Sequence, residues 1–289
     1  DVVHIHTLLH PISTVCALIA RLRNVPYIVC PHGTLSNYAL DGKNALAKRT
    51  YLNWFDARTI TGAYAMHYTA PMEPGNASRH CPQAVSRVIA NPVELQPAQS
   101  TDLDISTPYF LFLSRLEPKK RLDVCVDAFA RVAQDHPTVR LLIAGTGSDE
   151  IARRVARQAA ALGVGTRIQF LGPVDENEKA WALVNARALV LTSEDENFAV
   201  AVAQCLCAGR PVIISEHIGT SPDVAAHKAG LVCPLDAAQF ADAMARVLDN
   251  EHYASELGAN GARFANDHYS TKTIGRELVA LYREAEHGQ

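Results

Sequence analysis

The stretch YFLFLSRLEPKKRLDVCVDAFARVAQDHPTVRLLIAGTGSDE, residues 109–150, decides the fold. Two mostly apolar runs, at 109–114 and 139–145, flank a segment at 122–135 whose apolar residues recur at helical spacing. Apolar runs without polar alternation are typical of strands that are buried on both faces of a parallel sheet. The order strand, helix, strand with short links therefore predicts a βαβ unit.

The same alternation continues from this unit in both directions. Downstream, strands are predicted at 167–171, 188–192, 211–215 and 230–232, each followed by a helical pattern. Upstream, the pattern predicts strands at 1–7 and 25–30 with a helix between them, followed by a long helical pattern at 42–62. The chain is therefore expected to be α/β, with parallel sheets throughout.

A break in this periodicity divides the chain into two parts. The segment NPVELQPAQSTDLDISTP, residues 91–108, is rich in Pro, Ser, Thr and Asp, which is the composition of a linker. The predicted parts are a partial first domain at 1–95, a linker at 96–107, a second domain at 108–270 and a C-terminal helix at 271–289 that packs back on the first domain. Both domains read as Rossmann-like. Because domains rarely open with a strand, we expect the start of the first domain to lie upstream of Asp1.

Composition excludes several classes of protein. The 289 residues are 48% hydrophobic and 20% charged, as in globular proteins. The first hundred residues carry 8 Lys and Arg against 5 Asp and Glu, which is too weakly basic for a nucleic-acid surface but compatible with an anionic membrane surface. Seven irregularly spaced Cys argue against a disulfide framework. Without a membrane-spanning run or a signal peptide, we expect a cytoplasmic protein, with room for peripheral association on the inner face of the membrane.

The first candidate site is the loop SRLEPKKR, residues 114–121, which follows a buried strand and precedes a helix. Its four cations would lie beside free backbone amides at the helix N-terminus, an arrangement that binds a diphosphate. Arg115 could grip two phosphate oxygens, whereas Lys120 would act as a point charge. The alternative is a basic turn exposed to solvent.

The second candidate site is the acidic turn TSEDENF, residues 192–198, which leads into the next helix. A carboxylate such as that of Glu196 could bind sugar hydroxyls. The same side chains could instead stabilise the positive end of the helix dipole. The turn alone does not decide between these two roles.

Two further features involve histidine and glycine. His32 and Gly33 follow the second strand, where His could handle a proton and Gly would allow close backbone approach. His4 and His6 share one strand face by the two-residue period, but the sequence offers no third ligand, so no metal site is expected. The turn at 145–147 is only a fragment of a dinucleotide fingerprint, so NAD is not expected.

Together these segments resemble family 4 glycosyltransferases, which are retaining enzymes of GT-B architecture. The resemblance is strongest over roughly 108–235 and is carried by SRLEPKK (114–120), LLIAGTGSDE (141–150), LGPVDENEKAWALVNARALVLTSEDENFAVAVAQCLCAGRPVI (171–213) and IGTSPDV (218–224). In the first domain, DVVHIH (1–6) and VPYIVCPHGTLSNYAL (25–40) are similar to the same family. The resemblance implies two Rossmann-like domains facing each other across a cleft, the first of them incomplete.

The resemblance also implies residue roles. Arg115 and Lys120 would hold the pyrophosphate of a nucleoside-diphosphate-sugar, which would be a co-substrate, with no metal and no other cofactor. Glu196 would face the donor-sugar hydroxyls and His32 would lie near the reacting sugar, so these two are the catalytic candidates. The other donor-binding candidates are Gly33, Gly145, Val174, Asn197, Phe198, Ala199 and Gln204.

The sequence departs from the family at Gln204, which aligns with the second Glu of the signature and could bind ribose hydroxyls without a charge. The predicted function is retaining transfer of a hexose to a glycan or lipid-linked acceptor in cell-surface polysaccharide synthesis. One alternative is a non-catalytic nucleotide-sugar-binding subunit, which Gln204 and the incomplete first domain motivate. Another is a sugar-nucleotide epimerase, although the first domain shows no convincing set of acid-base carboxylates for it.

Overall fold

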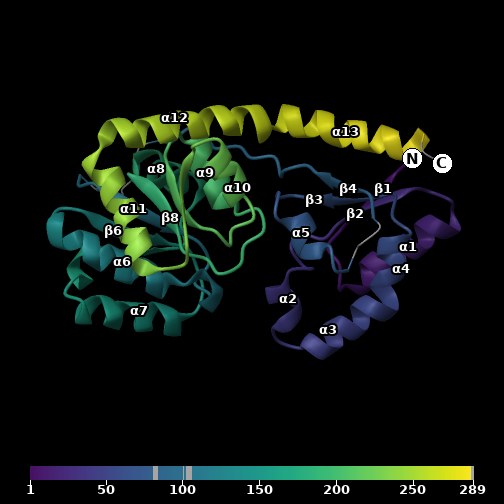
Figure 1. The fold of residues 1–289 in the computed structure, drawn as a ribbon, viewed down its shortest axis with the longest axis horizontal. Helices are drawn as coiled ribbons and strands as arrows, with labels where there is room; N and C mark the ends of the chain where they lie inside the picture. The colour runs from purple at the N-terminus through teal and green to yellow at the C-terminus, as the bar shows by residue number, and fades with distance from the viewer. Residues whose placement is uncertain (81–83, 100, 102–105, 288–289) are drawn as a thin grey trace. The chain divides into compact units, whose positions relative to one another are not determined.

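The chain folds as two compact units, each drawn in Figure 1. The computed structural model describes residues 1–80, 84–99, 101 and 106–287. Asp1–Pro92 and Thr271–Gln289 form the first unit, and Val93–Ser270 forms the second. Each unit contains one parallel sheet with helices packed on it, so the prediction of two Rossmann-like α/β domains is confirmed.

The first unit has a four-stranded parallel sheet in the order β1-β2-β3-β4. Its strands are β1 (Val3–His6), β2 (Tyr27–Cys30), β3 (Ala65–Tyr68) and β4 (Ser86–Val88). Its helices are α1 (Pro11–Leu22), α2 (Asn37–Asp41), α3 (Ala45–Tyr51), the π-helix η1 (Leu52–Asp56), α4 (Ala57–Thr61), α5 (Glu73–Ala77) and α13 (Thr271–His287).

The long helical pattern predicted at 42–62 is split into α3, η1 and α4. At the end of η1 the buried carboxylate of Asp56 accepts hydrogen bonds from the Leu9 amide at 2.7 Å and from the Thr14 hydroxyl at 3.2 Å. These bonds tie the end of η1 to the connection after β1 and to α1 itself. A buried carboxylate needs such hydrogen-bond partners. The change from α-helix to π-helix geometry thus coincides with the tertiary contacts of Asp56.

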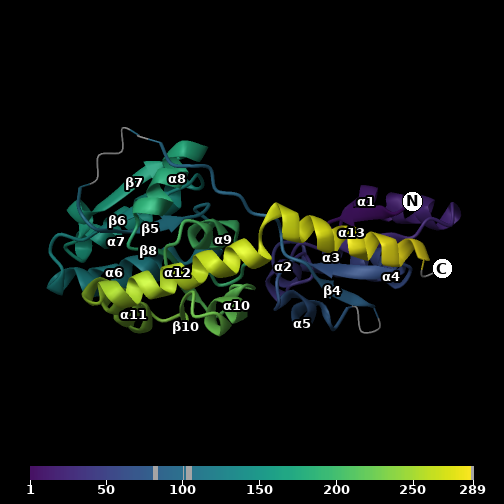
Figure 2. The same cartoon turned by 90° about the horizontal axis from the view of Figure 1, so that it is seen from above.

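Both faces of the first sheet are covered. Val29 and Met66 lie in an apolar cluster with α1 and α4, whereas Ile28 and Ala65 lie in a second cluster with Leu281 of α13. The two sets alternate along the strands, as the two-residue period of a strand requires. Figures 1 and 2 show α13 lying along this sheet, so the C-terminal helix belongs to the core of the first unit.

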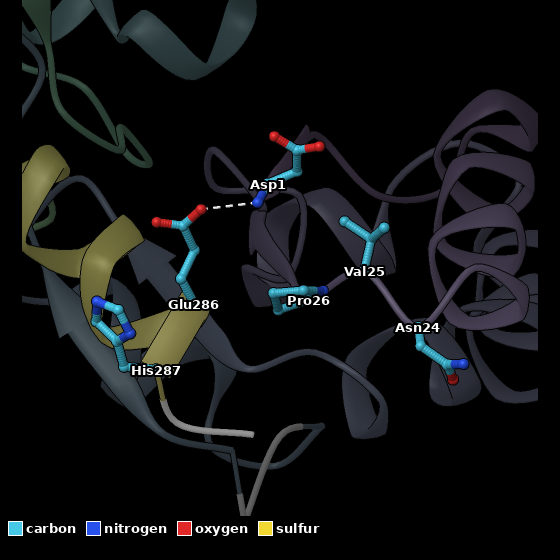
Figure 3. A pocket seen from close by; sticks show the side chains of 6 residues that line it. All are labelled: Asp1, Asn24, Val25, Pro26, Glu286 and His287. Carbon is cyan, nitrogen blue, oxygen red and sulfur yellow. Dashed lines mark hydrogen bonds and ion pairs between the residues drawn. The ribbon is translucent and has the colours of Figure 1, made fainter.

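The first residue is joined to α13 in a shallow pocket (Figure 3). The Asp1 ammonium donates a hydrogen bond to Glu286 at 2.7 Å, and Asn24, Val25, Pro26 and His287 complete the lining. Both charged groups are exposed to solvent, so their ion pair contributes little to stability.

The second unit has a six-stranded parallel sheet in the order β10-β9-β8-β5-β6-β7. Its strands are β5 (Tyr109–Leu113), β6 (Arg140–Ala144), β7 (Ile168–Gly172), β8 (Ala188–Leu191), β9 (Val212–Ser215) and β10 (Gly230–Cys233). Its α-helices are α6 (Leu122–Asp135), α7 (Asp149–Ala161), α8 (Glu176–Asn185), α9 (Val200–Cys207), α10 (Ser221–Ala226), α11 (Ala237–Asp249) and α12 (Glu251–His268).

The strand order of the second unit reverses between β5 and β8. From β5 the chain proceeds to β6 and β7 on one side, and from β8 it proceeds to β9 and β10 on the other. Crossovers between parallel strands are right-handed, so opposite directions of travel place the following helices on opposite faces. The helices that follow β5 and β8 therefore lie on opposite faces, and the carboxyl ends of these two strands form the switch point, where doubly wound sheets bind ligands.

The second unit begins at Val93, three residues before the predicted linker at 96–107. The Val93 amide donates to the Tyr269 carbonyl at 2.9 Å, which fastens this segment to the end of α12. Residues 100 and 102–105 of that linker lie outside the described residues.

None of the helices in the described ranges has the length and apolar character that crossing a membrane requires.

Candidate functional site

The loops that follow β5 and β8 are bonded to each other at the switch point. The Thr192 hydroxyl donates to the carbonyls of Arg121 at 2.8 Å and Lys120 at 3.1 Å, and Thr192 is fully buried. The Glu194 amide donates to the Lys119 carbonyl at 2.7 Å. The cationic loop and the acidic turn, which the resemblance assigns to one donor site, therefore lie side by side at the switch point.

Lys120 and Glu196 form an ion pair at the centre of this structure. The Lys120 side chain is buried, with 5% of the residue exposed, and its ammonium contacts a Glu196 carboxylate oxygen. The Ser193 hydroxyl donates to the same oxygen at 3.3 Å. Burial, and next the charge of Lys119, lowers the pKa of Lys120 to about 8. The site thus holds a cation that is poorly solvated and would be stabilised by an added anion.

Arg115 lies on the same loop but does not join this pair. Its guanidinium contacts Glu117 at 2.8 Å, and its side chain is 69% exposed. An exposed ion pair of this kind is worth little, so Arg115 can exchange Glu117 for another anion at small cost. The structure therefore brings two of the three predicted charged residues into contact and leaves the third at the surface.

The turn after Glu196 presents backbone rather than side chains. Phe198 is 4% exposed, and its ring packs edge-on against Tyr269 at 5.1 Å between centroids. Ala199 precedes α9 with φ +53°, and no side chain caps this helix start. Asn197 is half-buried and Gln204 is buried within α9. The Phe198 side chain therefore belongs to the core and is not available to a ligand.

Gly145 allows the loops after β5 and β6 to approach closely. Its φ is +132°, and a Cβ at this position would lie 2.0 Å from the Ser114 carbonyl oxygen. No other residue fits there without moving the backbone of the cationic loop. Val174 is half-buried and follows β7, which is the edge strand on the β5–β6 side of the sheet.

In the first unit, Gly33 does not offer its amide to a ligand. That amide donates to Glu73 Oε1 at 2.6 Å, and the Thr69 amide donates to Glu73 Oε2 at 2.8 Å. Glu73 is buried and was not predicted from the sequence. It fixes the loop after β2 and so fixes His32, which is exposed and has φ +51°.

His32 is the outer member of a histidine cluster at the carboxyl ends of β1, β2 and β3. Its Nε2 lies 2.8 Å from Nδ1 of His6, and the ring of His6 lies 4.3 Å from that of His4. The His4 ring also contacts His67, with 3.2 Å between the two nitrogens. Cys30 completes the group, with ligand atoms of His4, His6 and Cys30 all within 4.8 Å of one another.

Hydrogen bonds fix the tautomers of the inner histidines. Burial lowers the pKa of His67 and is the main cause that lowers the pKa of His4 to about 3, so both rings are neutral at pH 7. The Ile89 carbonyl can only accept, so His67 Nε2 carries the proton that it donates at 2.7 Å. His67 Nδ1 then accepts from His4 Nε2, and His4 Nδ1 accepts from the Tyr282 hydroxyl at 2.8 Å.

Cys30, the third possible metal ligand beside His4 and His6, was not predicted, although the sequence contains a signal for it. In the parallel register of β1 and β2, His6 is the partner of Cys30. Once the two strands are paired, in-register side chains on one face must be neighbours. His67 comes from β3, 37 positions after Cys30, and no local pattern links the two.

Family models match both units of the chain. The model of the group 1 glycosyl transferases matches residues 97–264, and the model of the glycosyl transferase 4-like domain matches residues 1–92. Among curated proteins, the alpha-1,3/1,6-mannosyltransferase ALG2 of Dictyostelium discoideum is 25% identical over 70% of this chain and 50% of its own length. The phosphatidyl-myo-inositol mannosyltransferase of Mycobacterium leprae is 30% identical over 60% of this chain and 45% of its own.

Solved structures have the same fold. Sucrose-phosphate synthase of Thermosynechococcus elongatus superposes with a TM-score of 0.82 and 22% identity, over 100% of this chain and 74% of that one. Anabaena HepE, in complex with UDP and glucose, gives a TM-score of 0.80 and 17% identity, over 96% and 77%. These likenesses confirm the GT-B fold.

The chain spans about half the length of the curated relatives it matches. The group 1 model nevertheless covers more than half of this chain, and the 4-like model covers most of the remainder. The chain therefore belongs to the group 1 glycosyl transferases of family 4.

Proposed function

We propose that the chain binds a nucleoside-diphosphate-sugar at the switch point of the second unit and serves in retaining transfer of its hexose to an acceptor. The observation that carries this proposal is the contact between the buried Lys120 and the half-buried Glu196 at the carboxyl ends of β5 and β8. The ammonium there can pair with a diphosphate, and the carboxylate beside it can accept hydrogen bonds from the hydroxyls of the attached sugar.

The chemical demand of the reaction is the departure of a diphosphate while positive charge develops on the sugar. In the proposed complex, Lys120 and Arg115 bind the phosphates and stabilise the negative charge that accumulates on them. The uncapped start of α9, after Ala199, adds amide donors and the positive end of a helix dipole. Gly145, Val174, Asn197, Phe198 and Gln204 remain donor-binding proposals, Phe198 through its amide.

Glu196 changes partner in this proposal. In the free protein its carboxylate neutralises Lys120, and once phosphate oxygens take over that role it is released to accept hydrogen bonds from sugar hydroxyls. His32 is proposed to act near the reacting sugar, held by His6 on its own unit. We assign no enzymic nucleophile, and donor binding at the switch point is proposed to need no metal.

The test is donor binding followed by transfer. Calorimetric titration with UDP-sugars and GDP-sugars should give binding that Arg115→Ala weakens and Lys120→Ala weakens further, because Lys120 is the buried cation. Arg131→Ala removes an exposed arginine of α6 and is the matched control. If both site variants bind as tightly as the control, the assignment of the site is wrong.

The acceptor is proposed to be a glycan or a lipid-linked glycan at an anionic membrane surface, in cell-surface polysaccharide synthesis. The helical segment formed by α3 and η1 exposes Leu46 (81%), Trp54 (73%) and Phe55 (52%), and it carries Lys48 and Arg49. Exposed apolar side chains among cations are typical of an interfacial helix. Such a helix binds anionic lipid by burying its apolar side chains and by electrostatic attraction of its cations.

Cosedimentation with vesicles that contain an anionic lipid tests this surface. Reversal of charge at Lys48 and Arg49 together should reduce binding, since each cation near such a surface contributes about 1 kcal/mol. The control reverses Arg153 and Arg157, two exposed cations of α7. Equal losses in both pairs, or no loss in either, would exclude a docking role for α3 and η1.

Gln204 favours a second candidate, a nucleotide-sugar-binding subunit without catalytic activity. A neutral amide stands where the family signature has a carboxylate, which is compatible with binding in the absence of turnover. Sugar transfer by the chain that Glu196→Ala abolishes would exclude this candidate. Donor binding of normal affinity with no transfer to any acceptor would support it.

A further inference from the structure

The histidine cluster of the first unit has the composition of a transition-metal site. His4 and His6 lie on one face of β1, and the register places Cys30 of β2 beside His6. One ligand atom from each of these three residues lies within 4.8 Å of the other two. The set combines imidazole nitrogen with sulfur, which favours Zn²⁺ and similar ions over Mg²⁺ or Ca²⁺, because those ions prefer oxygen ligands.

We propose that His4, His6 and Cys30 bind one Zn²⁺ ion, with solvent as the fourth ligand. His32 lies outside this set, and its Nε2, 2.8 Å from His6 Nδ1, can hold the His6 ring. Two nitrogens, one sulfur and a solvent oxygen would give a four-coordinate tetrahedral set. This inference replaces the expectation from sequence that His4 and His6 lack a third ligand, and it does not depend on the proposed donor site.

The partners of His4 support its role as a ligand. A histidine that binds a metal through one nitrogen usually donates its other N–H to an acceptor that fixes the ring. Here His4 Nε2 donates to His67 Nδ1, and His67 is itself fixed by the Ile89 carbonyl. His4 Nδ1 is left as a lone pair, and an ion would replace the Tyr282 hydroxyl that now donates to it.

The required movements are small. Zinc binds nitrogen at about 2.0–2.1 Å and sulfur at about 2.3 Å, so tetrahedral ligand atoms lie about 3.4–3.6 Å apart. Ligand atoms that lie up to 4.8 Å apart must close by about 1 Å, which side-chain rotation provides. His6 and His32 are exposed and Cys30 is buried, so an ion would enter from solvent and meet the thiol last.

Direct titration tests the proposal. The 289-residue chain, purified without a polyhistidine tag and treated with a chelator, is titrated with Zn²⁺ alone by calorimetry and with Co²⁺ alone by absorption spectroscopy. We expect one ion per chain, a thiolate-to-cobalt charge-transfer band and the intense visible bands of a four-coordinate site. X-ray absorption of the zinc form should show one sulfur at about 2.3 Å beside nitrogen at about 2.0 Å.

Matched variants assign the ligands. His6→Ala should weaken zinc binding by at least about tenfold, whereas His252→Ala, which removes an exposed histidine of α12, should not. Cys30→Ala should abolish the charge-transfer band, and Cys16→Ala at an exposed cysteine should retain it. Circular dichroism checks that each variant is folded.

Three results would overturn the proposal. They are the lack of saturable binding at one ion per chain, equal affinity in His6→Ala and His252→Ala, and a zinc spectrum without a sulfur neighbour. The spectrum is measured on the unaltered chain, so it decides the matter even if Cys30→Ala does not fold.

Discussion

Lys120 should make nucleoside-diphosphate binding depend on pH between 7 and 9. Its ammonium is almost wholly buried, and burial lowers its pKa to about 8, so the free protein loses this charge as pH rises through 8. A bound diphosphate favours the charged form and raises the pKa back toward its ordinary value. Above pH 8, therefore, the protein must take up a proton in order to bind.

The size of the effect follows from the pKa. If the pKa of Lys120 is about 8 in the free protein and well above 9 in the complex, the charged fraction before binding falls from about nine-tenths at pH 7 to about one-tenth at pH 9. The dissociation constant should then rise about tenfold, which is about 1.4 kcal/mol. Arg115 keeps its charge throughout and contributes nothing to this slope.

Calorimetry with UDP or GDP at pH 7, 8 and 9 and constant ionic strength measures this slope. Buffers of different ionisation enthalpy report the proton uptake directly. The control is Lys120→Arg, whose guanidinium stays charged, so its affinity should not change over the same range. A flat profile in the unaltered chain, or an equal slope in Lys120→Arg, would refute the role given to Lys120.

Three further predictions concern the groups that hold the two units' loops. Gly145→Ala should lower the free energy of unfolding by more than about 1 kcal/mol in urea titrations, because its Cβ would overlap the Ser114 carbonyl. Glu73→Ala should cost about 2–5 kcal/mol by the same measurement, since the Gly33 amide and a second buried amide lose their acceptor. Phe198→Leu should lower unfolding free energy by about 1–2 kcal/mol yet leave UDP affinity nearly unchanged, as only its amide is assigned to the ligand.

The central strands of the second sheet were predictable from sequence because they are apolar on both faces. Runs such as YFLFL and RLLIA have no competing helical interpretation once each is bounded by turn residues and followed by an amphipathic segment. The carboxyl ends of such strands then locate the functional loops. Predicting the contact between Lys120 and Glu196 required one more fact, the strand order. That order places β5 next to β8, although 74 residues lie between the end of β5 at Leu113 and the start of β8 at Ala188.

What could not be predicted depends on side chains that meet through tertiary structure. Arg115 and Lys120 look alike in a cationic loop, yet one faces solvent and the other is buried. Phe198 sits within a signature of polar residues, but its ring fills a gap beside Tyr269. The histidine cluster draws on three strands and α13, so neither spacing nor composition could have assembled it.

The ion pair of Lys120 and Glu196 is better explained by binding than by stability. A lysine pKa lowered from 10.5 to about 8 corresponds to about 3 kcal/mol against its charged form. Replacing a buried ion pair by apolar residues often stabilises a protein, so a fold selected for stability alone would not need these charges. In the proposed complex, the diphosphate would take the ammonium as its partner and release the carboxylate to the sugar hydroxyls. The desolvation of Lys120 in the free protein would then be offset on binding, which is the reason we connect this pair with a ligand.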